Sequence, residues 1–182
     1  FQFNRANNYD EFIDGLRLFS GPPQNILYSD VKGNIALNLP GKFPIKFLGQ
    51  GKFILDGSDP NHEWQDYIPY DHTLKIINPK RGFVSSANQH PSDKTYPYYY
   101  YSHNYEMYRG RRLNDRLESI NFVGLEDVMK IQNDNFSYKA YETLPVILNK
   151  IDSVSLDEKE LKYYNKISDW DYFSNSDNTS AP

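Results

Sequence analysis

Residues 82–97, which read GFVSSANQHPSDKTYP, are the stretch around which the chain is organised. They begin with an apolar run at 83–86 that predicts a strand, become polar at Asn88 and Gln89, and are interrupted by Pro91. An asparagine at a strand end carries two N–H donors on a short side chain, so it can be directed at an oxygen on which negative charge develops. The same residues are also ordinary turn formers after a strand, and both interpretations stay open on composition alone.

The composition indicates a globular domain and excludes several kinds of site. At 182 residues, with 38% hydrophobic and 16% aromatic residues, the chain is long enough to bury a core. Its formal net charge of −4 argues against a nucleic-acid-binding surface, which is expected to be basic. The absence of cysteine excludes disulfides, cysteine-ligated metals and a catalytic thiolate within the chain. No apolar run approaches the length of a transmembrane helix.

The first part of the chain predicts a helix followed by a β-hairpin. Residues 9–19 carry apolar side chains at helical spacing, and either Asn7 or Asn8 can cap this helix. Residues 25–30 and 34–39 predict two short strands joined by a tight, glycine-containing turn.

Residues 42–79 lose any regular period and predict a long, ordered excursion that is pinned by aromatic side chains and contains short strands. Trp64 is expected to anchor this excursion to the body of the domain, with stacking on a ligand as the alternative. Carboxylates such as Asp56 and Asp59 suit calcium ligation or simple solvation there. The four histidines of the chain show no ligand spacing, so the sequence predicts no metal site from them.

The second half of the chain predicts helices. The first covers residues 105–120 and is expected to be capped by Ser102 or Asn104. Three shorter helices are predicted at residues 124–131, 136–149 and 155–167. Pro145 is expected to kink or split the second of them, and Ser155 is expected to open a capping box at the start of the third.

With antiparallel strands early and helices late, the fold class is α+β. Residues 1–182 are expected to form a single domain, with a polar, frayed tail at 175–182. A tyrosine-rich run at 96–101 suits either packing or the stacking of a sugar. From these features alone, a non-catalytic carbohydrate-binding, ligand-binding or structural module that uses its tyrosine and tryptophan surface stays open beside an enzyme.

Several short blocks follow one another in an order that resembles a known family. They are QNILYSD at 24–30, GNI at 33–35, LPGKFPI at 39–45, EWQDYIPY at 63–70, INPKRGF at 77–83, SANQHP at 86–91, YRGRRL at 108–113 and ISDWD at 167–171. Together they resemble the motifs of the penicillin acylase (penicillin amidase) family. The resemblance covers nearly the whole chain, and the blocks occur in the family's order.

The resemblance implies an N-terminal-nucleophile hydrolase, which folds as a four-layer αββα sandwich. Such enzymes cleave their own precursor and expose a Ser, Thr or Cys at a new N-terminus. The α-amine of that residue, with an ordinary pKa of about 7.7–8.0, acts as the general base. The implied reaction is hydrolysis of a linear amide through a covalent acyl-enzyme.

The resemblance also implies roles for individual residues. Asn88 matches the asparagine whose side chain donates to the oxyanion, and Gln89 departs from the second asparagine of the family's pair. Arg109 matches the arginine that lies near the catalytic centre and orders the surroundings of the nucleophile. Gln24 stands where the family places a residue of the acyl pocket.

The nucleophile itself has no counterpart, because Phe1 cannot replace it, and the chain resembles a middle fragment of the large (β) subunit. The implied partners are therefore the small subunit, the rest of the large subunit and a small amide substrate, with no nucleic acid and no membrane. No cofactor is expected; the family's structural calcium belongs to the full-length enzyme, and its aspartate ligand has only tyrosines in its place at 98–101. The resemblance suits an extracytoplasmic enzyme. The fragment alone is expected to be inactive and to self-associate through exposed sheet edges.

Overall fold

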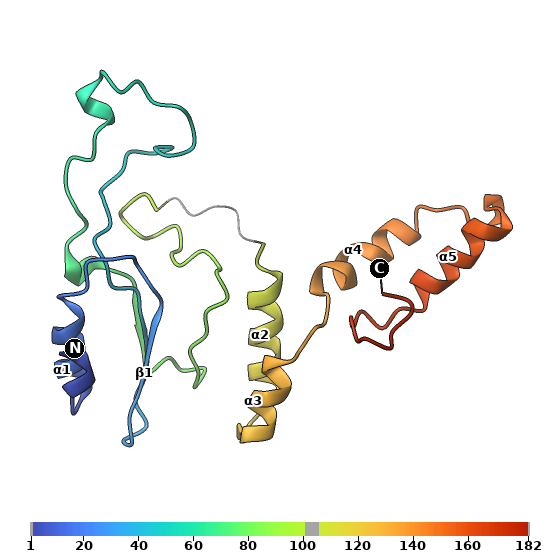
Figure 1. The fold of residues 1–182 in the computed structure, drawn as a ribbon, viewed down its shortest axis with the longest axis horizontal. Helices are drawn as coiled ribbons and strands as arrows, with labels where there is room; N and C mark the ends of the chain where they lie inside the picture. Colours follow the sequence, from blue (N-terminus) through green and yellow to red (C-terminus); the bar gives the residue numbers. More distant parts are fainter. Residues whose placement is uncertain (1, 101–105, 182) are drawn as a thin grey trace. The chain divides into compact units, whose positions relative to one another are not determined.

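The computed structural model describes residues 2–100 and 106–181. They form two compact units, Phe1–Tyr105 and Glu106–Pro182. The first unit carries a small antiparallel sheet and the second is helical, so the chain mixes helix and antiparallel sheet as the sequence predicts (Figure 1). The single-domain organisation and the complete four-layer sandwich stay predictions. None of the described helices is both long and apolar enough to cross a membrane.

Helix α1 (Tyr9–Leu16) begins the first unit, and Asn8 caps it as predicted. The side-chain oxygen of Asn8 accepts a hydrogen bond from the N–H of Glu11 at 2.9 Å, and its amide donates to the Glu11 carboxylate. The helix ends before residue 19, where the prediction placed its end. The reason is a tighter turn, in which the N–H of Phe19 donates to the carbonyl of Leu16.

The sheet of the first unit has the strand order β1-β2-β3 and is antiparallel throughout, with strands β1 (Ile26–Ser29), β2 (Ile35–Asn38) and β3 (Lys75–Ile77). Leu37 lies opposite Leu27 on one side and opposite Ile76 on the other. The predicted hairpin of β1 and β2 is thus confirmed, and β3 is a short strand at the end of the excursion.

Asp30 fixes the turn of the hairpin. Its carboxylate accepts hydrogen bonds from the side chain of Asn34 at 2.8 Å and from the backbone N–H groups of Asn34 and Lys32. These donors, the Asn34 side chain first among them, lower the pKa of Asp30 to about 2. Gly33 supplies the positive φ of 86° that the turn requires. The hydrogen bonds of the turn are thus consistent with the pairing register of β1 and β2.

The excursion at residues 42–79 is pinned at its base by an apolar cluster of Leu39, Phe43 and Ile68. The N–H of Ile68 donates to the carbonyl of Phe43 at 2.8 Å, so the outgoing and returning segments are bonded together. Tyr98 and Tyr100 pack against this cluster, as the packing interpretation of the tyrosine run requires. The last tyrosine of that run lies outside the described residues.

The prediction for Trp64 is wrong in this chain. Its side chain is 60% exposed, and the excursion is held by the apolar cluster at its base instead. Two short 3₁₀ turns lie within the excursion, η2 (Pro60–His62) and η3 (Tyr70–His72), and a third, η1 (Phe3–Arg5), precedes α1.

The strand predicted at residues 83–86 is also wrong. These residues form no regular secondary structure and join no strand pairing among the described residues. The side chain of Gln89 folds back and bonds to the backbone of Ser85 and Ala87, which are groups that a neighbouring strand would use. The guanidinium of Arg81 bonds in the same way to the carbonyl of Phe83 at 3.0 Å. Local side chains thus replace the ladder.

The second unit contains four helices among its described residues, α2 (Tyr108–Glu118), α3 (Leu125–Gln132), α4 (Tyr138–Leu148) and α5 (Glu158–Ser168), with a 3₁₀ turn η4 (Ser153–Ser155) before α5. Helix α4 continues through Pro145 as one helix, so the predicted split does not occur. The predicted caps of α2, Ser102 and Asn104, lie outside the described residues. The capping box of α5 is formed by Asp157 and Glu160, and the prediction of Ser155 is wrong because this residue belongs to η4.

An ion-pair cluster holds α2 in the second unit. The guanidinium of Arg112 donates from Nε and Nη2 to the carboxylate of Asp134, and the Nη2 bond is 2.7 Å long. Arg116 lies 3.7 Å from the same carboxylate, and Arg112 stacks on the ring of Phe136 at 4.2 Å. The Asp134 side chain is only 10% exposed. The cluster therefore links α2 to the segment between α3 and α4.

Candidate functional site

Asn88 lies in an exposed bend of the first unit with φ at 63°, in the left-handed region. Non-glycine residues adopt this region rarely, and asparagine adopts it more readily than most because its short amide can bond locally. The predicted strand end at Asn88 is therefore wrong, because the residue lies in a bend.

Gln89 closes this bend from the next position. Its side-chain oxygen accepts a hydrogen bond from the N–H of Ala87 at 2.6 Å, and its amide nitrogen donates to the carbonyl of Ser85 at 3.2 Å. Ser85 is buried, with 6% of its surface exposed, and the two bonds are partly buried. Ser85 and Ala87, which precede Asn88, are thus held by Gln89, which follows it.

Asn25 attaches the same bend to the sheet. Its side-chain amide donates to the hydroxyl of Ser86 at 2.7 Å, across 61 positions of the sequence. Gln24, the predicted acyl-pocket residue, is exposed and immediately precedes Asn25. The structure therefore brings the segments that carry Gln24 and Asn88 together at one end of β1.

A hollow of about 300 Å³ lies along β1, and neither Gln24 nor Asn88 lines it. It is lined by Leu27, Tyr28, Ser29, Ile35, Gly82, Phe83 and Val84, which are mostly apolar residues. Its floor comes from β1 and β2, and its wall comes from the segment that leads to Asn88. A small apolar group fits such a space.

Arg109 lies in the first turn of α2, in the second unit, and is exposed. Of the predicted site residues, Asn88 and Gln24 thus share one unit and Arg109 belongs to the other. The helix that carries Arg109 is well supported, since Arg111 forms an ion pair with Glu142 and Arg112 forms one with Asp134. The neighbouring arginines are therefore used to fasten α2.

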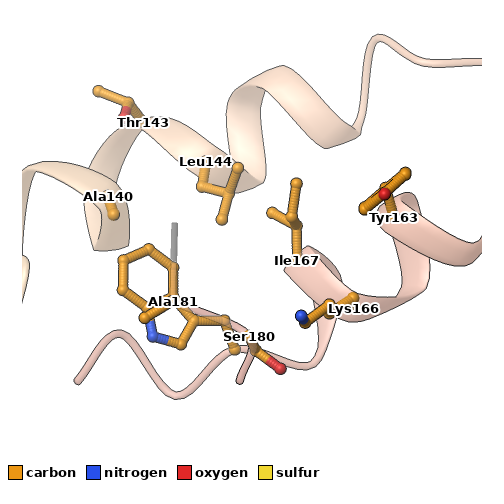
Figure 2. Close-up of a pocket in the computed structure, with 9 residues that line it drawn as sticks. Ala140, Thr143, Leu144, Tyr163, Lys166, Ile167, Ser180 and Ala181 are labelled. Carbon is orange, nitrogen blue, oxygen red and sulfur yellow. The ribbon is translucent and has the colours of Figure 1, made fainter. Parts of the chain in front are cut away.

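A second pocket, of about 460 Å³, lies within the second unit (Figure 2). Ala140, Thr143 and Leu144 of α4 line it on one side, and Tyr163, Lys166 and Ile167 of α5, Trp170, and Ser180 and Ala181 of the tail line the rest. The lining is mostly apolar and contains none of the predicted site residues. Asn178 attaches the tail here, because its side-chain amide donates to the Asp171 carboxylate at 2.8 Å and to the carbonyl of Phe173 at 2.9 Å; the fraying predicted for 175–182 stays a prediction.

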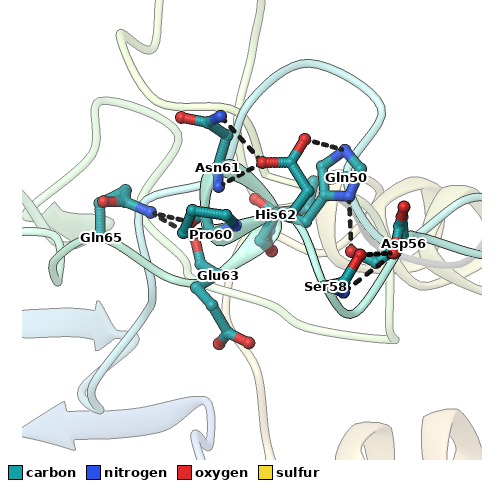
Figure 3. Close-up of polar contacts among 9 residues, drawn as sticks. Gln50, Asp56, Ser58, Pro60, Asn61, His62, Glu63 and Gln65 are labelled. Carbon is teal, nitrogen blue, oxygen red and sulfur yellow. Dashed lines mark hydrogen bonds and ion pairs between the residues drawn. The ribbon is translucent and has the colours of Figure 1, made fainter.

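The carboxylates of the excursion serve its turns (Figure 3). Asp56 accepts from the hydroxyl and the N–H of Ser58, and Asp59 accepts from the N–H and the side chain of Asn61. These bonds lower the pKa of both carboxyl groups. Among residues 2–100 and 106–181, no three histidine, aspartate or glutamate side chains gather in a way that could hold a metal ion.

The family assignment follows from the whole sequence. The profile of the family described as "Penicillin amidase" matches residues 1–182. The chain belongs to the penicillin amidase family. This confirms the family resemblance that the short blocks carried.

Relatives of this penicillin amidase family member include two named acylases. It is 24% identical over 132 residues to the penicillin acylase 2 proenzyme of Pseudomonas sp. (strain SE83), which covers 72% of this chain and 17% of that protein. It is 29% identical over 101 residues to the acyl-homoserine lactone acylase QuiP of Pseudomonas syringae pv. syringae (strain B728a), which covers 53% of this chain and 12% of that protein. The chain thus spans less than a fifth of either relative.

A solved structure shows the same fold. The chain resembles a thermostable penicillin G acylase from Alcaligenes faecalis with a TM-score of 0.71 and 21% sequence identity, over 94% of this chain and 31% of that one. The relatives and the family profile make this a family of amide hydrolases.

Sequence reasoning missed the two side chains that shape the bend, Asn25 and Gln89. Asn25 stood inside the block QNILYSD, where strand formation concealed its role, and Gln89 was noted only as a departure from the family pattern. Local side-chain-to-backbone hydrogen bonds are typical of Ser, Thr, Asn and Asp, so a glutamine at position 89 gave no such signal. Nothing in the sequence shows that residue 25 meets residue 86.

Proposed function

We propose that this chain is part of an amidohydrolase that cleaves a linear amide and releases an acyl group from an amine. The observation that carries the proposal is the placement of Asn88, whose amide stands in an exposed bend with a left-handed backbone, φ 63°. Unusual backbone conformations of this kind cluster at active sites. The family membership supplies the reaction class.

In the proposed reaction, an N-terminal Ser, Thr or Cys that lies outside this chain attacks the carbonyl carbon of the amide. Its proton passes to its own α-amine, whose ordinary pKa of about 7.7–8.0 suits a base at neutral pH. The carbonyl oxygen becomes an oxyanion and accepts a hydrogen bond from the side-chain N–H of Asn88. When the C–N bond breaks, the amine leaves with the proton, and water then hydrolyses the acyl-enzyme.

Asn88 contributes to this reaction only if its amide is already in place when the charge develops. A donor that must reorganise during the reaction loses part of its benefit, because the cost of moving it adds to the barrier. The bond from the N–H of Ala87 to Gln89 and the bond from Asn25 to Ser86 hold the backbone that leads into Asn88. This support makes Asn88 a preorganised donor in the proposal.

The roles proposed for the other two residues follow the family match. Gln24 lies two residues before β1 and does not line the hollow of about 300 Å³, so we assign it to the pocket for the acyl group on the family match alone. Arg109 is assigned to the surroundings of the nucleophile. The substrate class is an N-acylated amine, which is the chemistry common to the penicillin acylase and the acyl-homoserine lactone acylase among the relatives.

A binding or structural module is the alternative, and the tyrosine run gives it little support. Tyr98 bonds to the ring of His72 at 2.6 Å, Tyr96 donates to the carbonyl of His72, and Tyr100 packs on Phe43. These tyrosines serve the packing of the first unit. Trp64, which is 60% exposed, is the aromatic side chain among these that could still stack on a ligand.

The test is Asn88→Gly in the full-length, matured protein, assayed with a chromogenic N-acyl anilide. Glycine is preferred to alanine, because it keeps the left-handed backbone while removing the amide. We expect kcat to fall by about 10²–10³ with little change in KM, since the donor acts on charge that is present only in the transition state. Asn88→Asp is expected to be at least as harmful, because an ionised carboxylate can only accept a hydrogen bond.

A change confined to KM, or a loss of activity explained by a lower melting temperature, would show that Asn88 is a turn residue without a part in the chemistry. A melting curve of each variant is therefore measured alongside the kinetics.

A further inference from the structure

We propose that Gln89 is a positioning residue for the Asn88 amide. Its side chain sets the direction of that amide by bonding to the backbone of Ser85 and Ala87, which precede Asn88 in the chain. The inference rests on the proposed function of Asn88. Gln89 is partly buried and its polar atoms are occupied by the backbone, so it acts through Asn88 and has no contact with substrate in this role.

The first step of the argument is the geometry of the bridge. Its two ends are the N–H of Ala87, which donates to Gln89 Oε1 at 2.6 Å, and the carbonyl of Ser85, which accepts from Gln89 Nε2 at 3.2 Å. One planar amide therefore fixes the backbone on the N-terminal side of Asn88, while its own main chain continues on the C-terminal side. Asn88 is thus the one residue between the bridged segment, Ser85 to Ala87, and Gln89, whose side chain makes the bridge.

The second step is the conformation that this bridge encloses. A left-handed residue in a chain of L-amino acids relaxes to a right-handed or extended conformation unless its surroundings hold it. At Asn88, φ is 63°, and a relaxation of this angle would rotate the side chain by a large arc. The bridge opposes the rotation, because a change of φ at Asn88 moves Gln89 away from Ser85 and Ala87 and breaks its hydrogen bonds to them.

The third step is the connection to the rest of the unit. Ser86, between the two bridged residues, accepts the amide of Asn25 at 2.7 Å. Ser85 is buried, so the bridge is built on a fixed part of the fold. The sheet, through Asn25, therefore fixes the segment to which Gln89 bonds, and Gln89 in turn fixes the position of Asn88. A shift of the Asn88 amide relative to the oxyanion lowers the reaction rate steeply.

The experiment uses Gln89→Met in the full-length protein, since methionine keeps the length of the side chain and removes both hydrogen bonds. We expect kcat to fall roughly 10-fold with KM nearly unchanged, which is less than the effect of Asn88→Gly because the donor is displaced and still present. Gln89→Glu, which keeps the acceptor for Ala87, is a second variant if the methionine variant folds poorly; it places a charge near the developing oxyanion and is also expected to lower kcat.

Gln65→Met is the matched control. Gln65 is another glutamine whose amide bonds to backbone carbonyls, those of Pro60 and Glu63, but it lies in the excursion (Figure 3). It is exposed, and we expect its kcat to stay at the wild-type value. If losing a glutamine side chain that bonds to the backbone lowered activity in general, kcat would fall equally in Gln65→Met and Gln89→Met.

A double-mutant cycle decides whether Gln89 acts through Asn88. With Asn88→Gly already in place, Gln89→Met is expected to change kcat less than two-fold or so, since there is no amide left to position. A full, independent effect in that background would overturn the inference. If Asn88→Gly itself leaves kcat unchanged, the proposed function fails; if Asn88→Gly lowers kcat and Gln89→Met does not, only the positioning role fails.

Discussion

The substitution Asp134→Asn tests how α2, the helix that carries Arg109, is held in the second unit. Asp134 accepts three hydrogen bonds of note, two from Arg112 at 3.0 and 2.7 Å and one from the N–H of Phe136 at 3.1 Å. Asparagine has nearly the same shape but no charge, so the change removes the ionic part of these contacts and leaves the packing in place.

The expected loss in the free energy of unfolding is about 2–3 kcal/mol. A hydrogen bond to a charged group contributes about 1.5–3 kcal/mol, and removing one partner of a fully buried pair costs about 3–5 kcal/mol. The pair here is less than fully buried, because Arg112 is 22% exposed and can recover some hydration. Asn also keeps an acceptor oxygen, which places the expectation at the lower end of these ranges.

The pH dependence gives an independent check. Burial alone would raise the pKa of Asp134, but the hydrogen bonds from Arg112 and Phe136 outweigh it, so the pKa is lowered in the folded protein. A carboxyl whose folded pKa is lower than its unfolded value stabilises the fold above the unfolded value, and this contribution is lost as the pH falls through the folded value. The difference between wild type and Asp134→Asn should therefore be largest near neutral pH and shrink below about pH 4.

The assay is urea unfolding followed by tryptophan fluorescence. Trp170 is 7% exposed and lies in the second unit, so its emission reports on that unit, while Trp64 is 60% exposed and changes less. Glu142→Gln is the matched control, because its partner Arg111 is exposed, and a much smaller loss is expected there. A loss below about 0.5 kcal/mol for Asp134→Asn, or one that does not change with pH, would refute this account of the cluster.

Two further predictions concern the chain of 182 residues by itself. It should hydrolyse neither amides nor lactams, because under the proposal it holds the oxyanion donor without the nucleophile, and turnover by the purified chain that survives Asn88→Gly would contradict this. It should also form dimers or larger oligomers in light scattering across a dilution series, because β1 pairs only with β2 among the described residues and its Leu27 is 55% exposed; Leu27→Lys should reduce association, and a monomer at all concentrations would contradict the prediction.

The elements that the sequence predicted well are those whose causes are local. Asn8 and Glu11 lie within one turn, and the hairpin turn is bonded almost entirely by Asp30 and its neighbours. Helix boundaries moved where competing local bonds exist, as at α5, where Asp157 with Glu160 forms the cap that Ser155 was expected to form. Short-range hydrogen bonds of this kind can be inferred from residue spacing.

The elements that the sequence predicted poorly depend on contacts between distant positions. Residues 83–86 have the composition of a strand, but a strand requires a partner, and composition does not show whether one is available. Trp64 is a large aromatic residue of the kind that often anchors a loop, whereas the excursion is held at its base by the packing of Phe43 with Ile68. The junction of Asn25 with Ser86 joins residues 61 positions apart, and no local pattern indicates it.

The choice of residue at position 88 shows why the bend and the chemistry can be separated by experiment. The left-handed backbone, with φ at 63°, admits Gly, Asn and Asp readily, and a turn that only needs this conformation would accept any of the three. An oxyanion donor needs an N–H as well, which Gly lacks and ionised Asp cannot supply. Gln carries the amide, but it is not among the residues that favour this backbone. Asn meets both requirements, so glycine at position 88 preserves the bend while removing the donor, and a loss of kcat in this variant without a lower melting temperature measures the part of the amide in the chemistry.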